Sequence, residues 1–353
     1  MAQRSGIVEI PAAVLWRERC AGPRPPRRWD RRSASAKLAS MLRNQPHIYF
    51  HSTMDSADEW REALATQFVD FTFSVGEEVP NPESVDVAMV WTLPRHGLAP
   101  FTNLRAILSL GAGINQLDPR RLPAHVPLAR LVDASLTRMM IDYSRTAVYR
   151  YHRNFHLFEA RSRERRWIYV PPTLTGSTTV GVLGLGELGG EIASTLHAEG
   201  YAVAGWSRSR KSLPGIATHE GREELEAMLA RSDIVINVLP LTEETRFILS
   251  GPLFARFKRG ACLINMGRGL HLREADLLAA LEAGTIAAAT LDVSTVEPLP
   301  VDHPFWNHPR ILITPHVAGT AHPMTAAASI AANIRRALAG ERLAQQVDLL
   351  RGY

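Results

Sequence analysis

Three polar residues in the second half of the chain have side chains suited to binding and protonating a small organic acid. Arg268, Glu297 and His316 follow one another at intervals of 29 and 19 residues, and each comes just after a short apolar run. An arginine can hold a carboxylate and a carbonyl as a fork. A histidine can donate or accept a proton near neutral pH, and an adjacent carboxylate stabilises its charged form and fixes its tautomer. This trio suits a 2-oxo acid, whose carbonyl oxygen needs a proton as hydride reaches its carbon.

Each member of the trio also has an ordinary structural explanation when it is taken alone. Arg268 fits a surface arginine, Glu297 before a proline fits a turn, and His316 after a proline fits a loop histidine. Ligands of open α/β sheets bind at the carboxyl ends of the strands. Because all three residues are expected at that one edge, their convergence favours a site.

The stretch 178–200 has the pattern of a strand, a glycine-rich turn and a helix, and we expect the trio to face this unit. Residues 179–183 are a β-branched and apolar run, typical of a buried strand, and helical periodicity at 191–196 ends before Gly200. Glycines spaced Gly-x-Gly-x-x-Gly lie between them, which is the context that lets a dinucleotide pyrophosphate approach the backbone and the helix start. We predict that a nicotinamide cofactor is bound by Gly184, Gly186, Glu187, Leu188 and Gly189.

The turn after the next strand, expected at 202–206, bears on which cofactor is used. A fold that prefers NAD usually places an acidic residue there on the ribose 2′-hydroxyl, and this turn has none. Arginine can instead bind a 2′-phosphate, although a solvated basic turn is the ordinary alternative. We predict NADP(H) in preference to NAD(H), bound by Ser207, Arg208, Ser209, Arg210 and Lys211.

The remaining pattern predicts an α/β protein with parallel sheets, because strand-like and helix-like segments alternate. In the first half, strands are expected at 47–50, 85–91, 104–110 and 127–132, and helices at 56–68 and 139–160. In the second half, further strands are expected at 233–238, 261–265, 286–291 and 311–313, and helices at 243–248, 274–281 and 324–338. Two glycines at 111 and 113 follow a strand, so they could expose N–H groups to an anion or simply form a tight turn.

Charge and cysteine content exclude several classes of function. Residues 1–45 hold ten basic and three acidic residues, whereas the rest of the chain holds 30 basic and 32 acidic residues. The excess positive charge of the chain lies in residues 1–45, so its basic pI gives no indication that the rest of the chain binds nucleic acid. Cys20 and Cys262 form neither a disulfide framework nor a metal-ligand pattern, and no apolar run approaches the ~20 residues that span a bilayer. We predict a cytoplasmic protein that holds no metal and binds neither nucleic acid nor a membrane.

The Pro-, Arg- and Ser-rich residues 1–45 are expected to be a disordered basic extension. An organelle transit peptide and a tail that binds an acidic surface are two interpretations of this segment. We favour a third, in which the start codon is set too far upstream and the protein begins at Met41.

From about residue 46 to its end, the chain resembles the D-isomer-specific 2-hydroxyacid dehydrogenase family, and most closely its glyoxylate/hydroxypyruvate reductase A branch. The resemblance rests on the stretches SLGAGINQLD, VGVLGLGELGGEIA, GWSRSRK, NVLPLTEETR, INMGRGLHLREADLLAAL, ATLDVSTVEPLP, ILITPHVAG and VDLLRGY. The extension at 1–45 is a departure from the branch, and the missing acid after Trp206 agrees with its NADP-using members.

This resemblance implies two Rossmann-like domains, one flavodoxin-like and one dinucleotide-binding, with a cleft between them. Residues 46–145 would form a substrate (lid) domain completed by 320–353, and residues 146–319 would form the NAD(P)-binding domain. Closure over the cofactor would exclude water. The family also implies a homodimer, with the helix near 139–160 and the loop to the fingerprint helping the contact.

The resemblance further implies a role for each site residue. Arg268 would bind and polarise the substrate, and His316, partnered by Glu297, would be the acid/base. The turn Gly111, Ala112 and Gly113 would hold the substrate carboxylate, and substrate fit would depend on residues such as Trp91. Leu239, Pro240 and Thr245 would belong to the cofactor wall, and Asp292 would face the nicotinamide carboxamide.

The favoured function is therefore NADPH-dependent reduction of small 2-oxo acids such as glyoxylate and hydroxypyruvate. An NAD-linked dehydrogenase of another D-2-hydroxy acid, such as 3-phosphoglycerate, is the enzymatic alternative. A non-catalytic nucleotide-sensing scaffold on the same fold is the other.

Overall fold

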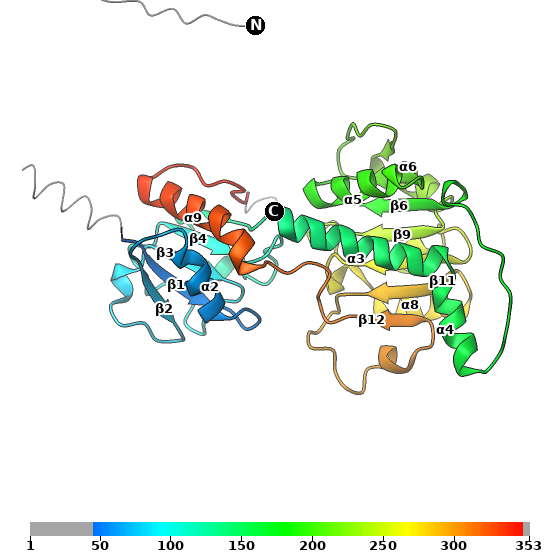
Figure 1. Ribbon diagram of the computed structural model, residues 1–353, viewed down its shortest axis with the longest axis horizontal. Coiled ribbons are helices and arrows are strands. Elements are labelled where there is room, and N and C mark those ends of the chain that lie inside the picture. Colours follow the sequence, from blue (N-terminus) through cyan, green and yellow to red (C-terminus); the bar gives the residue numbers. More distant parts are fainter. Residues whose placement is uncertain (1–44, 349–353) are drawn as a thin grey trace, which may run out of the picture. The chain divides into compact units, whose positions relative to one another are not determined.

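The computed structural model describes residues 45–348, which form two parallel β-sheets covered by helices (Figure 1). The predicted disordered extension lies outside the described residues apart from Gln45, and so do residues 349–353 of the predicted lid segment. No helix among the described residues is long and apolar enough to cross a membrane.

The first sheet has the strand order β2-β1-β3-β4-β5, with every neighbouring pair parallel. Its core contains apolar side chains from α2 and from the late helix α9, which pack with the strands through residues such as Leu64 and Ile330. A segment near the end of the chain therefore completes the core of the first sheet. The elements are β1 (His47–His51), α2 (Ala57–Ala65), β2 (Thr72–Val75), β3 (Val87–Val90), β4 (Ala106–Ser109), β5 (Leu128–Ala129) and α9 (Pro323–Ala339).

The second sheet has the strand order β12-β11-β10-β9-β6-β7-β8, again entirely parallel. Two apolar clusters contain its strand side chains together with those of the helices, which explains why the central strands read as continuous apolar runs. Its strands are β6 (Thr179–Leu183), β7 (Ala202–Trp206), β8 (Ala217–His219), β9 (Ile234–Asn237), β10 (Ala261–Asn265), β11 (Ile286–Leu291) and β12 (Ile311–Ile313).

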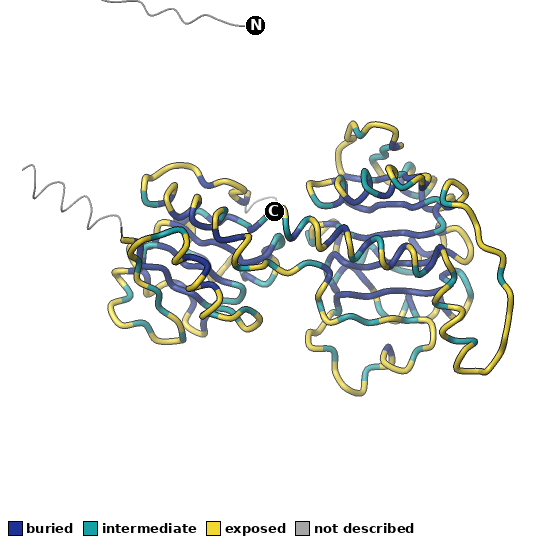
Figure 2. The backbone as a smooth tube through the Cα atoms, viewed as in Figure 1, coloured by how far each residue is buried: buried dark blue, intermediate teal, exposed yellow. Residues whose placement is uncertain are grey.

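The helices of this part are α3 (Ala134–His152), α4 (Phe155–Arg163), α5 (Glu187–Ala198), α6 (Gly221–Leu229), α7 (Gly251–Phe254) and α8 (Glu274–Glu282). Short 3₁₀ turns are η1 (Pro82–Ser84), η2 (Pro119–Arg121), η3 (Thr175–Ser177), η4 (Gly269–His271) and η5 (Pro304–Asn307). Figure 2 shows that the strands are mostly buried, whereas α4 and the segment that follows it are largely exposed.

The single helical run predicted at 139–160 is wrong, because the structure has two helices there. The chain turns between α3 and α4 at Arg153 and Asn154, and Asn154 has a left-handed φ of 58° that no helix interior accepts. Buried residues of α3 from Leu136 onward pack with the second sheet. The predicted domain limit at 145/146 thus falls inside α3.

The helix predicted at 243–248 is also wrong, because these residues form a turn. Phe247 has a φ of 54°, and its N–H donates to the carbonyl of Leu270 at 2.8 Å, which takes it out of any helical ladder. Four short or polar elements, β2, β8, α6 and α7, were not predicted from the sequence. The two strands are short and lie at sheet edges, and α6 is highly charged, so neither kind of element has a strong apolar pattern.

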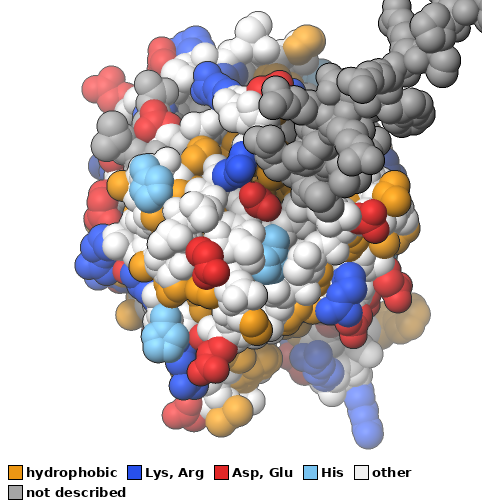
Figure 3. Space-filling model, turned by 90° about the vertical axis from the view of Figure 1, so that its left-hand side faces the viewer, with side chains coloured by type: hydrophobic (Ala, Val, Ile, Leu, Met, Phe, Trp, Pro, Cys, Tyr) orange, Lys and Arg blue, Asp and Glu red, His pale blue; other side chains and the backbone are white. Residues whose placement is uncertain are grey.

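On the face shown in Figure 3, basic and acidic side chains are interspersed and form no single basic patch. This distribution agrees with the nearly balanced charge of the chain after residue 45.

Candidate functional site

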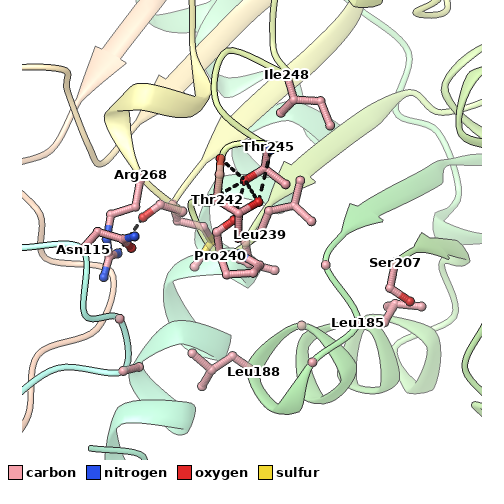
Figure 4. A pocket seen from close by; sticks show the side chains of 18 of the residues that line it. Asn115, Leu185, Leu188, Ser207, Leu239, Pro240, Thr242, Thr245, Ile248 and Arg268 are labelled. Carbon is pink, nitrogen blue, oxygen red and sulfur yellow. Dashed lines mark hydrogen bonds between the residues drawn. The ribbon is translucent and has the colours of Figure 1, made fainter. Parts of the chain in front are cut away.

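One cavity of about 1200 Å³ brings together most of the residues that the sequence singled out. Its lining includes loops that follow β3 and β4 of the first sheet and the loops that follow β6, β7, β9, β10, β11 and β12 of the second. In Figure 4, Arg268 and Asn115 lie toward one side of the pocket, and Leu185 and Ser207 lie toward the other. The cavity therefore lies at the carboxyl edge of the second sheet, where ligands of this architecture bind.

The three fingerprint glycines have different neighbours, which explains why each is a glycine. Gly184 has a φ of 103°, which L side chains rarely adopt, and a Cβ on Gly189 would lie 1.8 Å from the carbonyl oxygen of Gly184. A Cβ on Gly186 would meet no atom of the chain within 4 Å, although Gly186 lines the cavity at the N-cap of α5. Backbone conformation thus accounts for Gly184 and packing for Gly189, and Gly186 leaves its backbone uncovered at the cavity.

The basic turn after β7 contributes only part of its predicted set to the cavity. Ser207, Arg208, Ser209 and Lys211 line it, whereas Arg210 does not. Glu224 binds Arg210 Nη2 at 2.5 Å, and Glu220 accepts from its backbone N–H at 2.9 Å. These two carboxylates precede or belong to α6, which the sequence analysis had missed.

A short turn after β9 forms the wall next to the fingerprint. The three residues expected in the cofactor wall, Leu239, Pro240 and Thr245, all line the cavity. Thr245 Oγ1 donates to the carbonyl of Pro240 at 2.7 Å and accepts from the N–H of Thr242 at 2.8 Å, bonds that fix the turn (Figure 4). Asn115 donates to the carbonyl of Leu241 at 2.9 Å, so the loop after β4 is tied directly to this wall.

Asp292 organises the loop that carries His316. Its carboxylate accepts hydrogen bonds from Thr314 Oγ1 at 2.6 Å and from the N–H groups of Val317 and Ala318, both at 2.9 Å. Since the Thr314 hydroxyl proton is used there, Tyr143 donates to Thr314 Oγ1 at 2.6 Å. Burial raises the pKa of Asp292, and these hydrogen bonds oppose that rise.

His316 and Glu297 form a hydrogen-bonded pair. The His316 Nδ1 lies 2.7 Å from Glu297 Oε2, and Glu297 Oε1 accepts from the N–H of Ser294 at 3.0 Å. Burial raises the pKa of Glu297, but the hydrogen bonds from His316 and Ser294 outweigh it, so the pKa lies below its usual value. Glu297 is then ionised at neutral pH and accepts from Nδ1–H, which leaves Nε2 as the other ring nitrogen for proton exchange.

His316 lines the cavity with a left-handed φ of 55°, and its ring meets Trp91 edge to face at 5.9 Å between centroids. Glu297 itself does not line the cavity and reaches it only through His316.

Arg268 lies where the loop after β4 approaches the second sheet. Its Nη1 donates to the carbonyl of Gly267 at 2.7 Å, and a Cβ on Gly113 would lie 1.8 Å from its Nη2. Likewise, a Cβ on Gly111 would lie 2.5 Å from the ring of Trp91. Desolvation by burial lowers the Arg268 pKa, and the charge of Glu297 opposes this. The two glycines therefore allow an arginine and an indole to approach the backbone closely.

A buried histidine that the sequence analysis missed holds the backbone of Arg268. The Arg268 N–H donates to His271 Nδ1 at 3.0 Å, so the proton of the neutral ring is on Nε2, 3.2 Å from the carbonyl of Pro240. Burial lowers the pKa of His271 to about 4, which keeps the ring neutral and able to accept. His271 lies in the INMGRGLHLREADLLAAL stretch, but only its burial distinguishes it from a surface histidine.

The arrangement can bind a carboxylate at the guanidinium and exchange a proton at the imidazole within one cavity. All predicted site residues line this cavity except Arg210 and Glu297. Tyr143, Thr314 and His271 support the site without having been predicted, because only tertiary contacts connect them to it. Among the described residues, no group of His, Cys, Asp or Glu side chains is arranged to hold a metal ion.

Comparison with known proteins identifies relatives over nearly the whole described chain. The family model for "D-isomer specific 2-hydroxyacid dehydrogenase, NAD binding domain" matches residues 146–318. A glyoxylate/hydroxypyruvate reductase A of Serratia proteamaculans is 40% identical over 316 residues, which cover 87% of this chain and 100% of the relative.

Solved structures agree with this assignment. A D-isomer specific 2-hydroxyacid dehydrogenase of Xanthobacter autotrophicus, in complex with NADPH and MES, matches with a TM-score of 0.83 and 42% identity over 88% of this chain and 100% of its own. An NADPH-dependent glyoxylate/hydroxypyruvate reductase of Sinorhizobium meliloti, in complex with NADP and sulfate, matches with a TM-score of 0.80 and 31% identity over the same shares. The chain belongs to the D-isomer specific 2-hydroxyacid dehydrogenase family.

Proposed function

We propose that this protein uses NADPH to reduce glyoxylate, hydroxypyruvate and similar small 2-oxo acids to D-2-hydroxy acids. The observation that carries the proposal is the His316–Glu297 pair, which shares one cavity with Arg268 and the fingerprint glycines. The relatives named glyoxylate/hydroxypyruvate reductase A support the choice of substrate class.

Substrate binding in this proposal depends on Arg268 and the turn after β4. The guanidinium would hold the carboxylate and carbonyl oxygens, and backbone N–H groups of Gly111–Gly113 would complete the carboxylate site. Support comes from the 1.8 Å that would separate a Gly113 Cβ from Arg268 Nη2, since the turn and the guanidinium approach each other closely enough to share one anion. Trp91, packed on Gly111, would limit the size of the group on the far side of the carbonyl.

The chemical step needs one proton and one hydride. A nicotinamide cofactor bound in the cavity would supply the hydride to the carbonyl carbon. His316 would donate the Nε2 proton to the carbonyl oxygen, so that C=O becomes CH–OH. Ionised Glu297 would stabilise the imidazolium form before transfer and hold the ring in place through the 2.7 Å bond at Nδ1.

The residues present fit a dinucleotide with a 2′-phosphate, and we propose NADP(H) in preference to NAD(H). Gly186 leaves backbone accessible at the start of α5, and the turn after β7 offers Ser207, Arg208, Ser209 and Lys211 without an acid. Arg210 is assigned to the structure of that turn, because Glu220 and Glu224 bind it. The relatives solved with NADPH or NADP support the same cofactor.

We propose that residues 46–145 together with 320–353 form the substrate domain and residues 146–319 the cofactor domain. Helix α9 packs in the core of the first sheet, which supports the assignment of 320–353 to the substrate domain. Helix α3 crosses the limit at 145, and its buried side chains pack with the second sheet. It would move with the cofactor domain during any closure of the cavity.

We further propose a homodimer that forms through α4 and the segment 164–175, which together we call the α4 surface. This surface exposes large apolar side chains that a folded chain normally covers. They are Phe155, Leu157, Phe158, Trp167, Ile168, Tyr169 and Leu174. A cytoplasmic location is proposed as well, in keeping with the unpaired, buried thiol of Cys262.

A turnover assay tests the function directly. Purified protein is mixed with NADPH or NADH and with glyoxylate, hydroxypyruvate or a larger 2-oxo acid, and absorbance at the nicotinamide band is followed. NADPH oxidation with the two small acids is expected. Turnover confined to NADH and another acid would support a different dehydrogenase, and nucleotide binding without any turnover would support a scaffold.

Two variants test the assigned roles in the same assay. His316→Gln is expected to lower kcat by about 100-fold or more, the usual effect of losing an acid/base group. Glu297→Gln keeps an acceptor near Nδ1 but removes the negative charge beside the ring, so reduction should slow. Normal turnover by His316→Gln would refute the assignment of the proton donor.

A further inference from the structure

Helix α6 forms a wall of the cavity beside the turn that follows β7. Its residues Gly221, Arg222 and Leu225 line the cavity together with the turn residues. Trp206 Nε1 donates to the carbonyl of Gly221 at 2.8 Å, so the end of β7 is joined to the first residue of the helix. The start of α6 is thus fixed next to the turn where the ribose 2′ position of a dinucleotide would lie.

Carboxylates in and just before α6 hold one arginine, Arg210, away from the cavity and another, Arg222, in its wall. Arg210 is bound by Glu220 and Glu224 and lies outside the cavity lining. Arg222 lines the cavity and uses only its Nε, which donates to Glu226 Oε1 at 2.8 Å. Its two Nη atoms make no hydrogen bond or ion pair with the part of the chain that the structure describes.

Glu226 holds Arg222 in position but occupies only one of its hydrogen-bond donors, the Nε–H. The hydrogen bond and charge of Arg222 lower the pKa of Glu226, so the carboxylate is ionised at neutral pH. An i,i+4 pair of this kind holds the stem of the arginine along the helix. The terminal nitrogens, which form the fork that binds planar or tetrahedral anions, make no hydrogen bond with residues 45–348.

We propose that Arg222 is a specificity-determining residue that binds the 2′-phosphate of NADP(H) together with Arg208 and Lys211. The proposal deepens the proposed function, since it requires the cofactor to be a phosphorylated dinucleotide. A phosphate monoester with a charge of about −2 accepts charge-assisted hydrogen bonds from a guanidinium. NAD(H) carries a hydroxyl at this place and offers no charge to Arg222, so the residue discriminates between the two cofactors.

Calorimetric titration with nucleotide fragments tests the proposal without any turnover. The full-length protein is titrated with adenosine 2′,5′-bisphosphate and with adenosine 5′-monophosphate. Arg222→Ala is expected to weaken binding of the bisphosphate by about 10-fold or more, the effect of one lost hydrogen bond to a charged group. Binding of the monophosphate should stay unchanged, and Arg222→Lys should recover part of the loss because it restores the charge.

Arg256 provides the matched control. Its Nε lies 3.2 Å from Glu226 Oε2, so it shares the carboxylate of Arg222, but it does not line the cavity. Arg256→Ala is expected to leave the affinity for both fragments unchanged. Equal losses in Arg222→Ala and Arg256→Ala would overturn the proposal, because a general loss of positive charge would then explain them. An equal loss of both fragments in Arg222→Ala would also overturn it, since the contact would be with the adenosine.

The outcomes separate this proposal from the proposed function. Wild-type protein that binds neither fragment would refute the nucleotide site and with it the reductase. Wild-type protein that favours the bisphosphate, with no effect of Arg222→Ala, would refute only the role of Arg222. Failure to reduce any 2-oxo acid would leave the fragment result standing.

Discussion

Gly113 and Gly186 both line the cavity, but the structure gives them different neighbours. A Cβ on Gly113 would overlap Arg268 Nη2, whereas a Cβ on Gly186 would meet no atom of the described chain within 4 Å. Gly113→Ala should therefore displace the guanidinium and lower kcat/KM for glyoxylate by about 10-fold or more, as expected for a lost charged hydrogen bond. Gly186→Ala should instead raise KM for NADPH.

Steady-state kinetics with each substrate varied in turn will separate the two effects. Circular dichroism spectra of both variants provide the folding control. If Gly113→Ala raised KM for NADPH as strongly as KM for glyoxylate, the turn after β4 would not be specific to the substrate site.

At the scale of elements, the loop after β10 depends on the buried ring of His271. This ring accepts from the backbone of Arg268 only while it is neutral, and burial lowers its pKa from 6.5 to about 4. The unfolded chain therefore binds this proton near pH 6.5 and the folded chain only near pH 4. Stability from this group is fully present at pH 7 and decreases as the pH falls through that window, by up to about 3 kcal/mol in the limit.

Denaturant unfolding at pH 7 and pH 5 will measure this dependence. Between these values the wild-type protein is expected to lose about 2 kcal/mol of stability from His271. A His271→Asn variant lacks the titrating ring, so its unfolding free energy should depend less on pH even if it is lower throughout. His303→Asn serves as a control, because His303 Nε2 lies 3.1 Å from Glu274 Oε2 and neither residue lines the cavity. An unchanged pH slope in His271→Asn would contradict the prediction.

At the scale of the whole molecule, the exposed apolar side chains of the α4 surface predict that two chains associate there. Trp167 is fully exposed and lies among other exposed apolar side chains. A charge there should be compatible with the folded monomer but unfavourable in a desolvated interface. Trp167→Asp is therefore expected to shift the protein from dimer to monomer in analytical ultracentrifugation.

Val69 offers a comparison for this experiment, because it is also fully exposed but lies outside the α4 surface, between α2 and β2. Val69→Asp should leave the oligomeric state unchanged. A wild-type monomer, or a dimer that persists in Trp167→Asp, would refute the proposed interface.

Much of the architecture could be predicted from the sequence because its signals are local. The strands at 179–183, 202–206, 261–265, 286–291 and 311–313 are mainly apolar runs in a parallel sheet, and the structure has them with the same bounds. The break between α3 and α4 could not be predicted, since residues 139–160 contain no Gly or Pro that would mark the left-handed turn at Asn154. The edge strand β8 could not be predicted either, because two of its three residues, Thr218 and His219, are polar, whereas the equally short edge strand β12 is entirely apolar.

The sequence by itself determined the kinds of side chain at the site, because Arg268, Glu297 and His316 follow strands whose carboxyl ends must share one edge. Only the tertiary structure decided which charges face the cavity. Arg210 and Arg222 are the same residue type on adjacent segments, yet two carboxylates bind Arg210 outside the cavity and Glu226 holds Arg222 in its wall. That difference depends on how α6 packs beside β7, a contact between segments that no local pattern records.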